Sequence, residues 1–367
     1  MPFAFRPAFS IFNFDNNKKK SIFAVLKMIM LTSQEIESFK LQLADSKKIA
    51  IVTHYNPDGD ALGSSLAIYS YFLNLGYDVT CIVPNPFPDY LSWMPGAEKV
   101  INAQKQLQKA KRLIQNADIL FVSDMNAAHR AGKELENSLL KSKAFKILID
   151  HHPNPSFDAP IVYSTIEATS ASEMVYRFIK EINPESQITI DCADCIYTGM
   201  ITDTGSLSYA CNRPLIYQIL EDLMKIGVDG ELIHRQVYDN YSESRLRLLG
   251  ASLNNMVVME DHATSYMFLT RQDLLDNGFK NGDTEGFVNY GLALSSVKFT
   301  AFFTEREERI RISFRSKDEF DVNVFAATYF NGGGHKNASA SYHYDTLENT
   351  LQYFKETVKN HPELNKL

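Results

Sequence analysis

Three apolar runs in this chain end directly in acidic and histidine side chains. Each run has the continuous apolar character of a strand buried on both faces of a parallel sheet. Because the carboxyl ends of such strands lie along one edge, we expect these polar side chains to converge there. The runs are IAIVTHYNPDGDA from Ile49 with His54, Asp58 and Asp60, ADILFVSD with Asp124, and FKILIDHH with Asp150, His151 and His152.

A fourth segment, YTGMITDTGSLSY, adds Asp203 after an apolar stretch of helical character. Carboxylates mixed with imidazoles favour manganese, iron or zinc over calcium, which takes oxygen ligands alone. The set is too large for one ion. It suits two metals about 3.5 to 4 Å apart, bridged by a carboxylate, which together hold a phosphoryl group during in-line displacement.

The loop after the first run allows two interpretations. Asp58 and Asp60 lie two residues apart, so an extended loop would direct both carboxylates toward one ion. Alternatively, the loop is a polar turn in which Asp60 is the N-cap of the following helix, predicted from Ala61 to Leu75. For this loop taken alone, the two interpretations are about equally good.

Strands and helices alternate from Lys48 to about Ile201, which predicts an α/β fold with a doubly wound, mostly parallel sheet. A second, smaller α/β domain is expected to follow. It would contain a strand (TSYMFLT), a helix from Arg271, a helix over DTEGFVNYGLALSSV and a hairpin over VKFTAFFTEREERIRISFRSK. The predicted divisions are an N-terminal extension over 1–30, a catalytic domain over 31–233, a helical connector over 234–259 and a substrate-binding domain over 260–367.

The second domain carries a candidate anion site. In the second arm of the hairpin, alternation places Arg311 and Arg315 on the face opposite Ile310, Ile312 and Phe314. An arginine-rich strand face is more often solvated than functional. However, the segment NGGGHKNASAS follows, and three consecutive glycines allow backbone amides to approach an anion as a nest. The sequence therefore predicts phosphate or nucleotide binding here.

Composition limits the substrate. The net charge is −7, with 45% hydrophobic and 22% charged residues. A chain of this charge does not bind long nucleic acid through bulk positive charge, so a nucleic-acid substrate should be short. Cys192 and Cys195 form a CxxC, but no second pair accompanies it, which favours core cysteines in a reducing cytosol over a zinc site. We expect a cytoplasmic protein.

The first thirty residues do not fit the remainder of the chain. Lys18 to Lys20 and SIFAVLKMIML resemble a signal peptide, but Lys27 interrupts the apolar run, which is also too short to cross a bilayer. Translation from Met28 or Met30 is the simpler explanation, and we expect no membrane association. Thr32 and Glu35 then predict a capping box at the start of a helix.

Taken together, the ordered motifs HYNPDGD, VSD, DHH, TDTG and NGGGHKNASA resemble those of the DHH phosphoesterase superfamily with an appended DHHA1 domain, over nearly all of the chain from about Leu31. The resemblance is strongest to the nanoRNase branch, whose members hydrolyse short RNA and 3'-phosphoadenosine 5'-phosphate. It implies a hydrolase with two manganese ions per active site, with magnesium or cobalt as substitutes. A homodimer is compatible with it.

The resemblance also implies a role for each site residue. His54 and Asp58 would bind one ion, Asp60, His151 and Asp203 the other, and Asp124 would bridge them. His152 would donate to a phosphate oxygen, and Asp150 would orient an imidazole. The substrate contacts implied in the DHHA1 domain are Arg315, Ser316, Arg311, Gly333, Gly334 and His335.

Two alternatives stay open at the level of the sequence. Other DHH–DHHA1 proteins hydrolyse cyclic di-AMP or its linear product. A different class would be a nucleotide-sensing module without catalytic activity, although every expected metal position is filled here. A pyrophosphatase or polyphosphatase is disfavoured, because that branch has another C-terminal domain with a basic motif in place of GGGH.

Overall fold

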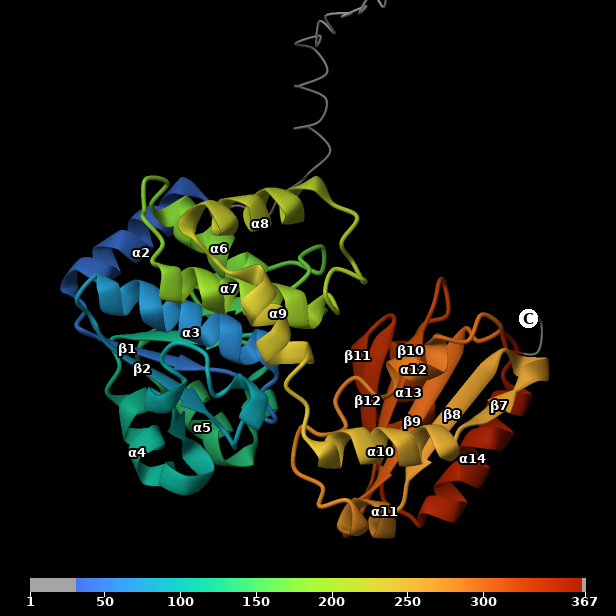
Figure 1. Cartoon of the computed structure of the whole chain (residues 1–367). Helices are drawn as coiled ribbons and strands as arrows, with labels where there is room; N and C mark the ends of the chain where they lie inside the picture. The colour runs from blue at the N-terminus through green and yellow to red at the C-terminus, as the bar shows by residue number, and fades with distance from the viewer. Residues whose placement is uncertain (1–30, 365–367) are drawn as a thin grey trace, which may run out of the picture.

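The computed structural model describes residues 31–364, which form two sheets, each flanked by helices (Figure 1). The expectations for residues 1–30, including the start codon, lie outside the described residues. Within residues 31–364, no helix has the combination of length and apolar character needed to span a bilayer.

The first sheet confirms the predicted doubly wound α/β fold. Its six strands are all parallel, in the order β3-β2-β1-β4-β5-β6. The strand order reverses between β1 and β4, which is where ligands of open parallel sheets bind. The strands are β1 (Lys48–Val52), β2 (Asp78–Val83), β3 (Ile101–Asn102), β4 (Ile119–Ser123), β5 (Phe145–Asp150) and β6 (Ile161–Ser164).

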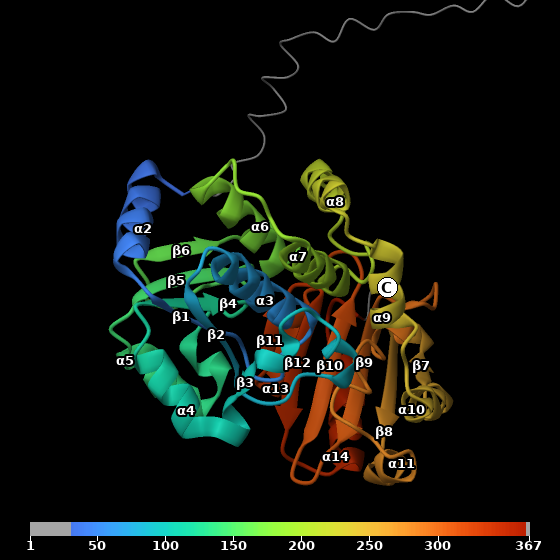
Figure 2. The ribbon, with the colours of Figure 1, turned by 60° about the vertical axis from the view of Figure 1, so that its left-hand side comes forward.

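Helices cover both faces of this sheet (Figure 2). On one face α2, α3, α6 and α7 bury a large apolar core that includes Cys81, Cys192 and Cys195, as expected for core cysteines. On the other face α4 and α5 bury a smaller core. The helices are α2 (Ser33–Asp45), α3 (Gly59–Asn74), α4 (Ala103–Gln115), α5 (Lys133–Lys141), α6 (Ala171–Ile182), α7 (Ile190–Asp203), α8 (Pro214–Ile226) and α9 (Gly230–Tyr238), with short 3-10 turns η1 (Asp89–Leu91), η2 (Ala97–Lys99) and η3 (Ala128–Ala131).

The second sheet is mixed, with the order β11-β12-β10-β9-β8-β7, and only β8 and β9 pair in parallel. One face packs on α13 and α14, and part of the other packs on α10, α11 and α12. The elements are α10 (Glu243–Asn254), β7 (Val257–Met259), η4 (Glu260–His262), β8 (Thr264–Leu269), α11 (Arg271–Asp276), α12 (Asn289–Leu292), β9 (Phe299–Glu305), β10 (Ile310–Ser316), α13 (Val322–Phe330), β11 (Gly333–His335), β12 (Ala338–His343) and α14 (Leu347–Asn360).

Several local predictions can be compared with these elements. The capping box of Thr32 and Glu35 and the hairpin of β9 and β10 are confirmed. The expected helix over DTEGFVNYGLALSSV is wrong, because only α12 forms there and the rest is turns. The range 234–259, expected as a connector, comprises the end of α9, all of α10 and the edge strand β7.

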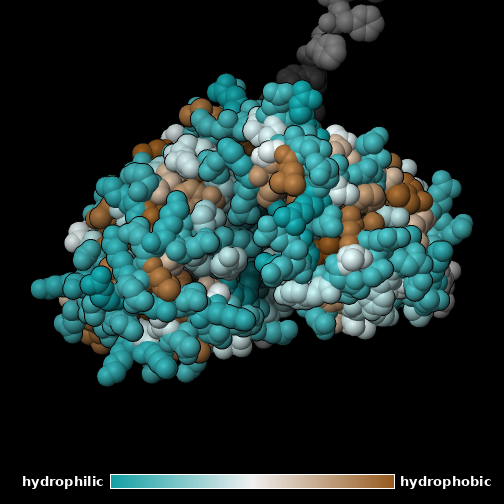
Figure 3. All heavy atoms as spheres, turned by 90° about the horizontal axis from the view of Figure 1, so that it is seen from below, coloured by the Kyte–Doolittle hydropathy of each residue, from teal (hydrophilic) through white to brown (hydrophobic). Residues whose placement is uncertain are grey.

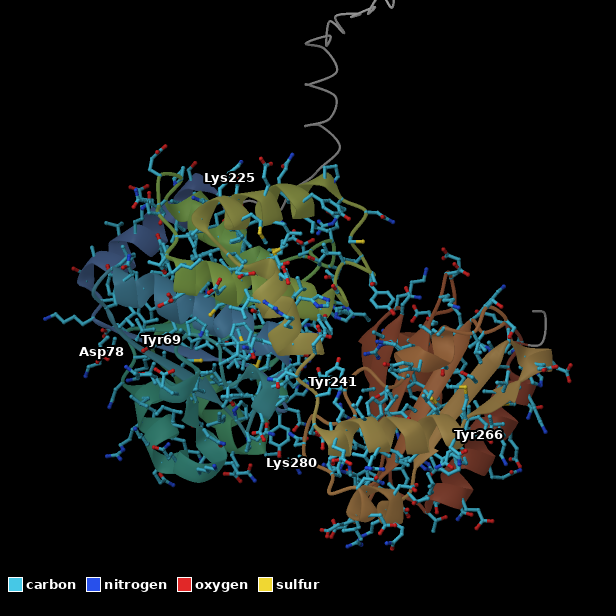
Figure 4. All side chains as sticks on the ribbon, in the orientation of Figure 1. Tyr69, Asp78, Lys225, Tyr241, Tyr266 and Lys280 are labelled. Carbon is cyan, nitrogen blue, oxygen red and sulfur yellow. The ribbon has the colours of Figure 1, made fainter. Side chains whose placement is uncertain are left out.

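Contacts at the junction hold the two halves together. Tyr241 lies where the chain passes from one half to the other (Figure 4), and the guanidinium of Arg245 stacks on its ring at 4.3 Å. The same guanidinium donates to the carbonyls of Gly282, Asp283 and Glu285. The Tyr90 hydroxyl donates to the Glu285 carboxylate at 2.9 Å, which links the loop after β2 to the second half. The first half therefore contacts the second half directly through this hydrogen bond.

Candidate active site

The first group of possible metal ligands comprises His54, Asp58 and Asp124. His54 follows β1, and its Nε2 lies 3.2 Å from Asp124 Oδ2 and 3.9 Å from Asp58 Oδ2. Its Nδ1 lies 2.9 Å from the Tyr55 carbonyl, an acceptor, so Nδ1 carries a proton and Nε2 is the nitrogen that a metal ion could bind. This is the tautomer that a metal ligand requires.

Asp58 has two tasks. It is the N-cap of α3, because its Oδ1 accepts from the amides of Asp60 and Ala61 at 3.1 and 3.0 Å. The expectation that Asp60 caps this helix is therefore wrong: α3 begins at Gly59, two residues earlier than predicted. The second oxygen of Asp58 stays directed toward His54.

The second group comprises Asp60, His151 and Asp203. The Nε2 of His151 lies 3.7 Å from Asp60 Oδ2 and 3.6 Å from Asp203 Oδ2. His151 follows β5, whereas Asp203 is the last residue of α7. One ligand atom from each of the three residues fits within 4.8 Å of the others, as is also true of the first group.

Asp60 does not share the direction of Asp58, contrary to the extended-loop interpretation. Because it lies in the first turn of α3, its carboxylate reaches the start of α6 and accepts from the amides of Ala171 and Ser172 at 2.6 and 2.9 Å. Gly199 on α7 makes room for this contact, since a Cβ there would lie 2.8 Å from Asp60 Oδ1. The N-terminus of α6 stabilises the negative charge.

Asp124 lies between the two groups and touches both. Its Oδ2 is the neighbour of His54, and its Oδ1 lies 3.4 Å from Nε2 of His151. The residue is 2% exposed, its φ is +57°, a costly conformation for aspartate, and its Oδ1 has no hydrogen-bond partner among residues 31–364. A buried carboxylate oxygen without a donor, flanked by two imidazoles, fits a bridging metal ligand.

The charges of this cluster perturb each other. Burial opposes ionisation of Asp124, but the attraction of His151 and His54 holds its pKa well below the usual value. Burial, with the charges of Asp124 and Asp203, raises the pKa of Asp60 well above its usual value. Burial also raises the pKa of Asp203 to about 7. A bound divalent cation would neutralise the negative charge of these closely spaced carboxylates.

His152 and Asp150 form a separate pair beside Asp124. Asp150 is fully buried at the end of β5, and it accepts from the backbone amide of His152 at 3.1 Å and from Nδ1 of the ring at 2.8 Å. This fixes the ring, whose Nδ1 lies 3.6 Å from Asp124 Oδ1. Burial lowers the pKa of His152, an effect that the hydrogen bond to Asp150 partly offsets.

His335 comes to the same place from the second sheet. Its ring stacks on His152 with centroids 4.7 Å apart, and it lies 5.0 Å from the ring of His151. Burial and the charges of His151 and His152 lower the pKa of His335 to about 3, so the ring is neutral. The two halves of the chain therefore meet at the ligand cluster.

A cleft of about 1190 Å³ opens from the cluster between the two sheets. Arg311, Ser313 and Arg315 on β10 line its second wall, opposite the ligands. A smaller pocket of about 270 Å³ lies on the other side of the cluster and contains Ser316 and, again, Arg315. Figure 3 shows a hollow between the two halves, bordered mainly by hydrophilic residues.

The glycine segment is not an open nest. The amide of Gly332 donates to the Ala326 carbonyl and that of Gly334 to Asn323 Oδ1, both at 2.9 Å. Gly333 and Gly334 belong to β11, which pairs with β12. Glycine is required because a Cβ on Gly334 would lie 2.5 Å from the Ala338 carbonyl oxygen. The segment brings His335 to the metal ligands instead of offering all its amides to an anion.

The other predicted substrate contacts differ in whether their polar groups are free to bind a substrate. The Oγ of Ser316 is engaged, donating to Phe320 O and accepting from Asn337. Arg315 and Arg311 share the open face, as alternation predicted, while Ile310, Ile312 and Phe314 are buried in the core. Sequence reasoning missed Arg130, whose charge acts on His54, His152 and His335, because it lies in an irregular turn after β4 without a motif.

Comparisons with known proteins agree with this geometry. The model of the DHH family, N-terminal domain, matches residues 48–200, and that of the DHHA1 domain matches residues 263–360. A crystal structure of an exopolyphosphatase-related protein from Bacteroides fragilis is 40% identical, with a TM-score of 0.88 over 93% of this chain and 100% of that one. The chain belongs to the DHH–DHHA1 family of phosphoester hydrolases, which confirms the resemblance seen in its motifs.

Curated relatives are more distant in sequence but similar in length. The bifunctional oligoribonuclease and PAP phosphatase NrnA of Bacillus subtilis is 24% identical over 85% of this chain and 95% of its own length. The protein of the same name from Thermus thermophilus is 27% identical over 80% of this chain and 83% of its own. The exonuclease RecJ, in a crystal structure with manganese, shares the fold at 13% identity with a TM-score of 0.52.

Proposed function

We propose that this protein hydrolyses short oligoribonucleotides to mononucleotides and 3'-phosphoadenosine 5'-phosphate to AMP, with two manganese ions. The observation that carries the proposal is the position of Asp124, whose two oxygens face two separate groups of ligands at the mouth of an interdomain cleft. Relatives of similar length are named for these two activities. The cytoplasm, where such substrates arise, is the expected location.

The ligands divide as the family resemblance implies. His54 and Asp58 would hold one ion, Asp60, His151 and Asp203 the other, and Asp124 both. When bound, such a pair supplies a nucleophile activated near neutral pH and neutralises the charge of the phosphoryl group. Nitrogen and carboxylate donors suit manganese, and magnesium or cobalt would be substitutes.

His152 is placed to act on the phosphoryl group. Because its Nδ1 donates to Asp150, only Nε2 can reach a substrate oxygen, and it can donate there only when the ring is protonated. The charge of Asp150 favours that protonated form, whereas burial opposes it. Asp150 is therefore a positioning residue that also keeps His152 ready to donate to developing negative charge.

The second sheet would hold the nucleotide. Arg315 lines both the cleft and the smaller pocket. Burial lowers the pKa of its guanidinium, and the negative charge of Asp203 partly offsets this effect. A guanidinium that lines the same pockets as the metal ligands Asp58 and Asp203 suits a phosphate beside the scissile one.

The test is product analysis with manganese, using an RNA dinucleotide, an RNA pentanucleotide, 3'-phosphoadenosine 5'-phosphate and cyclic di-AMP. Wild type should release mononucleotides from both RNAs and AMP from the bisphosphate, and Asp124→Asn should release none. Turnover of cyclic di-AMP alone would assign the protein to the cyclic-dinucleotide activity. Tight nucleotide binding without turnover would instead indicate a sensor and refute the proposal.

A further inference from the structure

Arginines continue along the second sheet beyond the substrate contacts that the sequence predicted. Arg311 and Arg315 are four residues apart on β10, so their Cα atoms are separated by roughly 13 Å along the strand. Beyond Arg311, the turn between β9 and β10 adds Arg306 and Arg309. The positive charges thus extend from the metal ligands to the outer end of the sheet.

An aromatic ring accompanies the outer arginines. Tyr342 on β12 is the direct cross-strand partner of Arg311, so the two side chains project from the same, open face of the sheet. Tyr342 lines the cleft, and the guanidinium of Arg309 lies over its ring at 4.0 Å. The N–H groups of a guanidinium lie in its own plane, so a guanidinium stacked on a ring can still donate them to a phosphate.

None of the outer arginines forms an ion pair with a carboxylate among residues 31–364. The turn also contains two acidic residues, Glu307, which pairs with Arg271, and Glu308, while Glu305 accepts from the Arg271 amide. Burial and the charges of Arg311 and Arg309 lower the pKa of Arg306 to about 10, so the guanidinium groups repel each other. Arg306 is stacked on Phe279 at 4.0 Å, whereas Arg309 and Arg311 are available to an anionic ligand.

The cleft has room for such a ligand. Its volume of about 1190 Å³ exceeds the roughly 300–1,000 Å³ typical of pockets for single small molecules. 3'-Phosphoadenosine 5'-phosphate would fill only the part near the ligands. The outer part, which includes Tyr342 and the exposed Tyr344, would then stay empty.

We propose that Arg309 and Tyr342 form a distal subsite that binds the phosphate and base of a nucleotide remote from the scissile bond. This inference rests on the proposed function and deepens it: the substrate class is a single-stranded oligonucleotide long enough to reach from the metal site to this pair. Aromatic stacking with a neighbouring arginine is how proteins hold single-stranded bases without sequence preference. The subsite makes the enzyme sensitive to substrate length.

The experiment compares two substrates in wild type, Arg309→Ala and Tyr342→Ala. For an RNA pentanucleotide, each substitution should raise KM by about fivefold or more with kcat unchanged. For 3'-phosphoadenosine 5'-phosphate, KM and kcat should both stay within twofold of wild type, as roughly expected for a substrate that does not reach the pair. Tyr342→Phe, which keeps the ring, should retain the wild-type KM for RNA.

Controls separate the possible failures. Arg247→Ala removes an exposed arginine that pairs with Glu243 on α10, outside both pockets. This variant should leave KM and kcat unchanged for both substrates. In Arg309→Ala, log KM for RNA should depend on log salt with a slope smaller by about 0.7. Equal effects on both substrates, or none on either, would overturn the subsite. The subsite would also be overturned if the two substitutions weakened the binding of inorganic polyphosphate but left KM for RNA unchanged. If wild type hydrolyses neither substrate, the proposed function itself fails.

Discussion

The imidazole of His335 stacks on that of His152, with ring centroids 4.7 Å apart and an angle of 29° between the planes. One ring comes from β11 of the second sheet, and the other follows β5 of the first. A residue of the glycine-rich segment therefore lies at the ligand cluster, and we expect catalysis to depend on the arrangement of the two halves.

Removal of this contact should impair catalysis. We expect His335→Ala to lower kcat/KM for 3'-phosphoadenosine 5'-phosphate by about tenfold to a hundredfold, because His152 loses the ring that packs against it at the cluster. His335→Phe keeps a flat ring that can stack but has no nitrogen to form hydrogen bonds. Comparison of this variant with His335→Ala therefore separates the effect of stacking from that of hydrogen bonding. Steady-state kinetics measure kcat/KM for both variants. A wild-type value in His335→Ala would show that the contact has no catalytic role.

The pair of His152 and Asp150 gives a second prediction. Asp150→Asn removes the negative charge and leaves one acceptor oxygen for two His152 donors, the backbone amide and Nδ1, so we expect kcat to fall about tenfold to a hundredfold. The protonated form of His152 becomes less stable, so the alkaline limb of the pH profile of kcat should move to lower pH. Manganese content should stay at the wild-type level; its loss would mean that Asp150 supports the metal ligands instead.

The metal-free protein should lose stability between about pH 6.5 and 8.5. Four groups have pKa values that folding raises, so the folded state binds more protons than the unfolded state in this range, and its stability falls as pH rises. The unfolded reference for the two histidines is near 6.5, and the raised value for Asp203 is about 7. The groups are Asp60, Asp203, His54 and His151.

Below about pH 6.5 the balance differs. Folding lowers the pKa values of His152 and His335, so in that range the unfolded state takes up protons on these two rings, which opposes the continuing effect of Asp60 and Asp203. Calorimetry in EDTA should therefore show a decrease of Tm above pH 6.5, and saturating manganese should abolish it. A Tm that stays constant from pH 6.5 to 8.5 without metal would contradict the proposed electrostatics.

Two neighbouring glycines offer a matched pair for stability. Gly334 has a φ of +153°, and a Cβ there would lie 2.5 Å from the Ala338 carbonyl oxygen and 2.8 Å from the Ser339 Cα. We expect Gly334→Ala to reduce the free energy of unfolding by about 2 kcal/mol or more. Gly333→Ala should be tolerated, since its nearest neighbour would be 3.7 Å away. Denaturant titration compares them, and equal losses would contradict the packing argument.

Much of the fold could be predicted because its signals are local. Apolar runs that end in Asp124 and in the DHH residues indicate buried parallel strands, and parallel pairing then brings their ends together. Alternation placed Arg311 and Arg315 on the open face of β10, and the capping box located the start of α2. In each case the pattern lies within one element.

The rest depends on contacts between elements. The direction of Asp60 is set by the amides of α6, which lies far along the chain. The glycine segment resembles a nest until strand pairing and Asn323 take up its amides. The stack of Arg309 on Tyr342 arises only when β10 pairs with β12. Sequence periodicity does not specify any of these.

Asp124 is proposed to serve two metal ions at once. Metal-free protein titrated with manganese in a calorimeter, with hydrolysis of 3'-phosphoadenosine 5'-phosphate measured at each step, tests it most directly. We predict two ions per chain in wild type, with activity rising mainly as the second binds, and neither full stoichiometry nor activity in Asp124→Asn. Full activity with one ion per chain, or two ions bound normally by Asp124→Asn, would contradict the account.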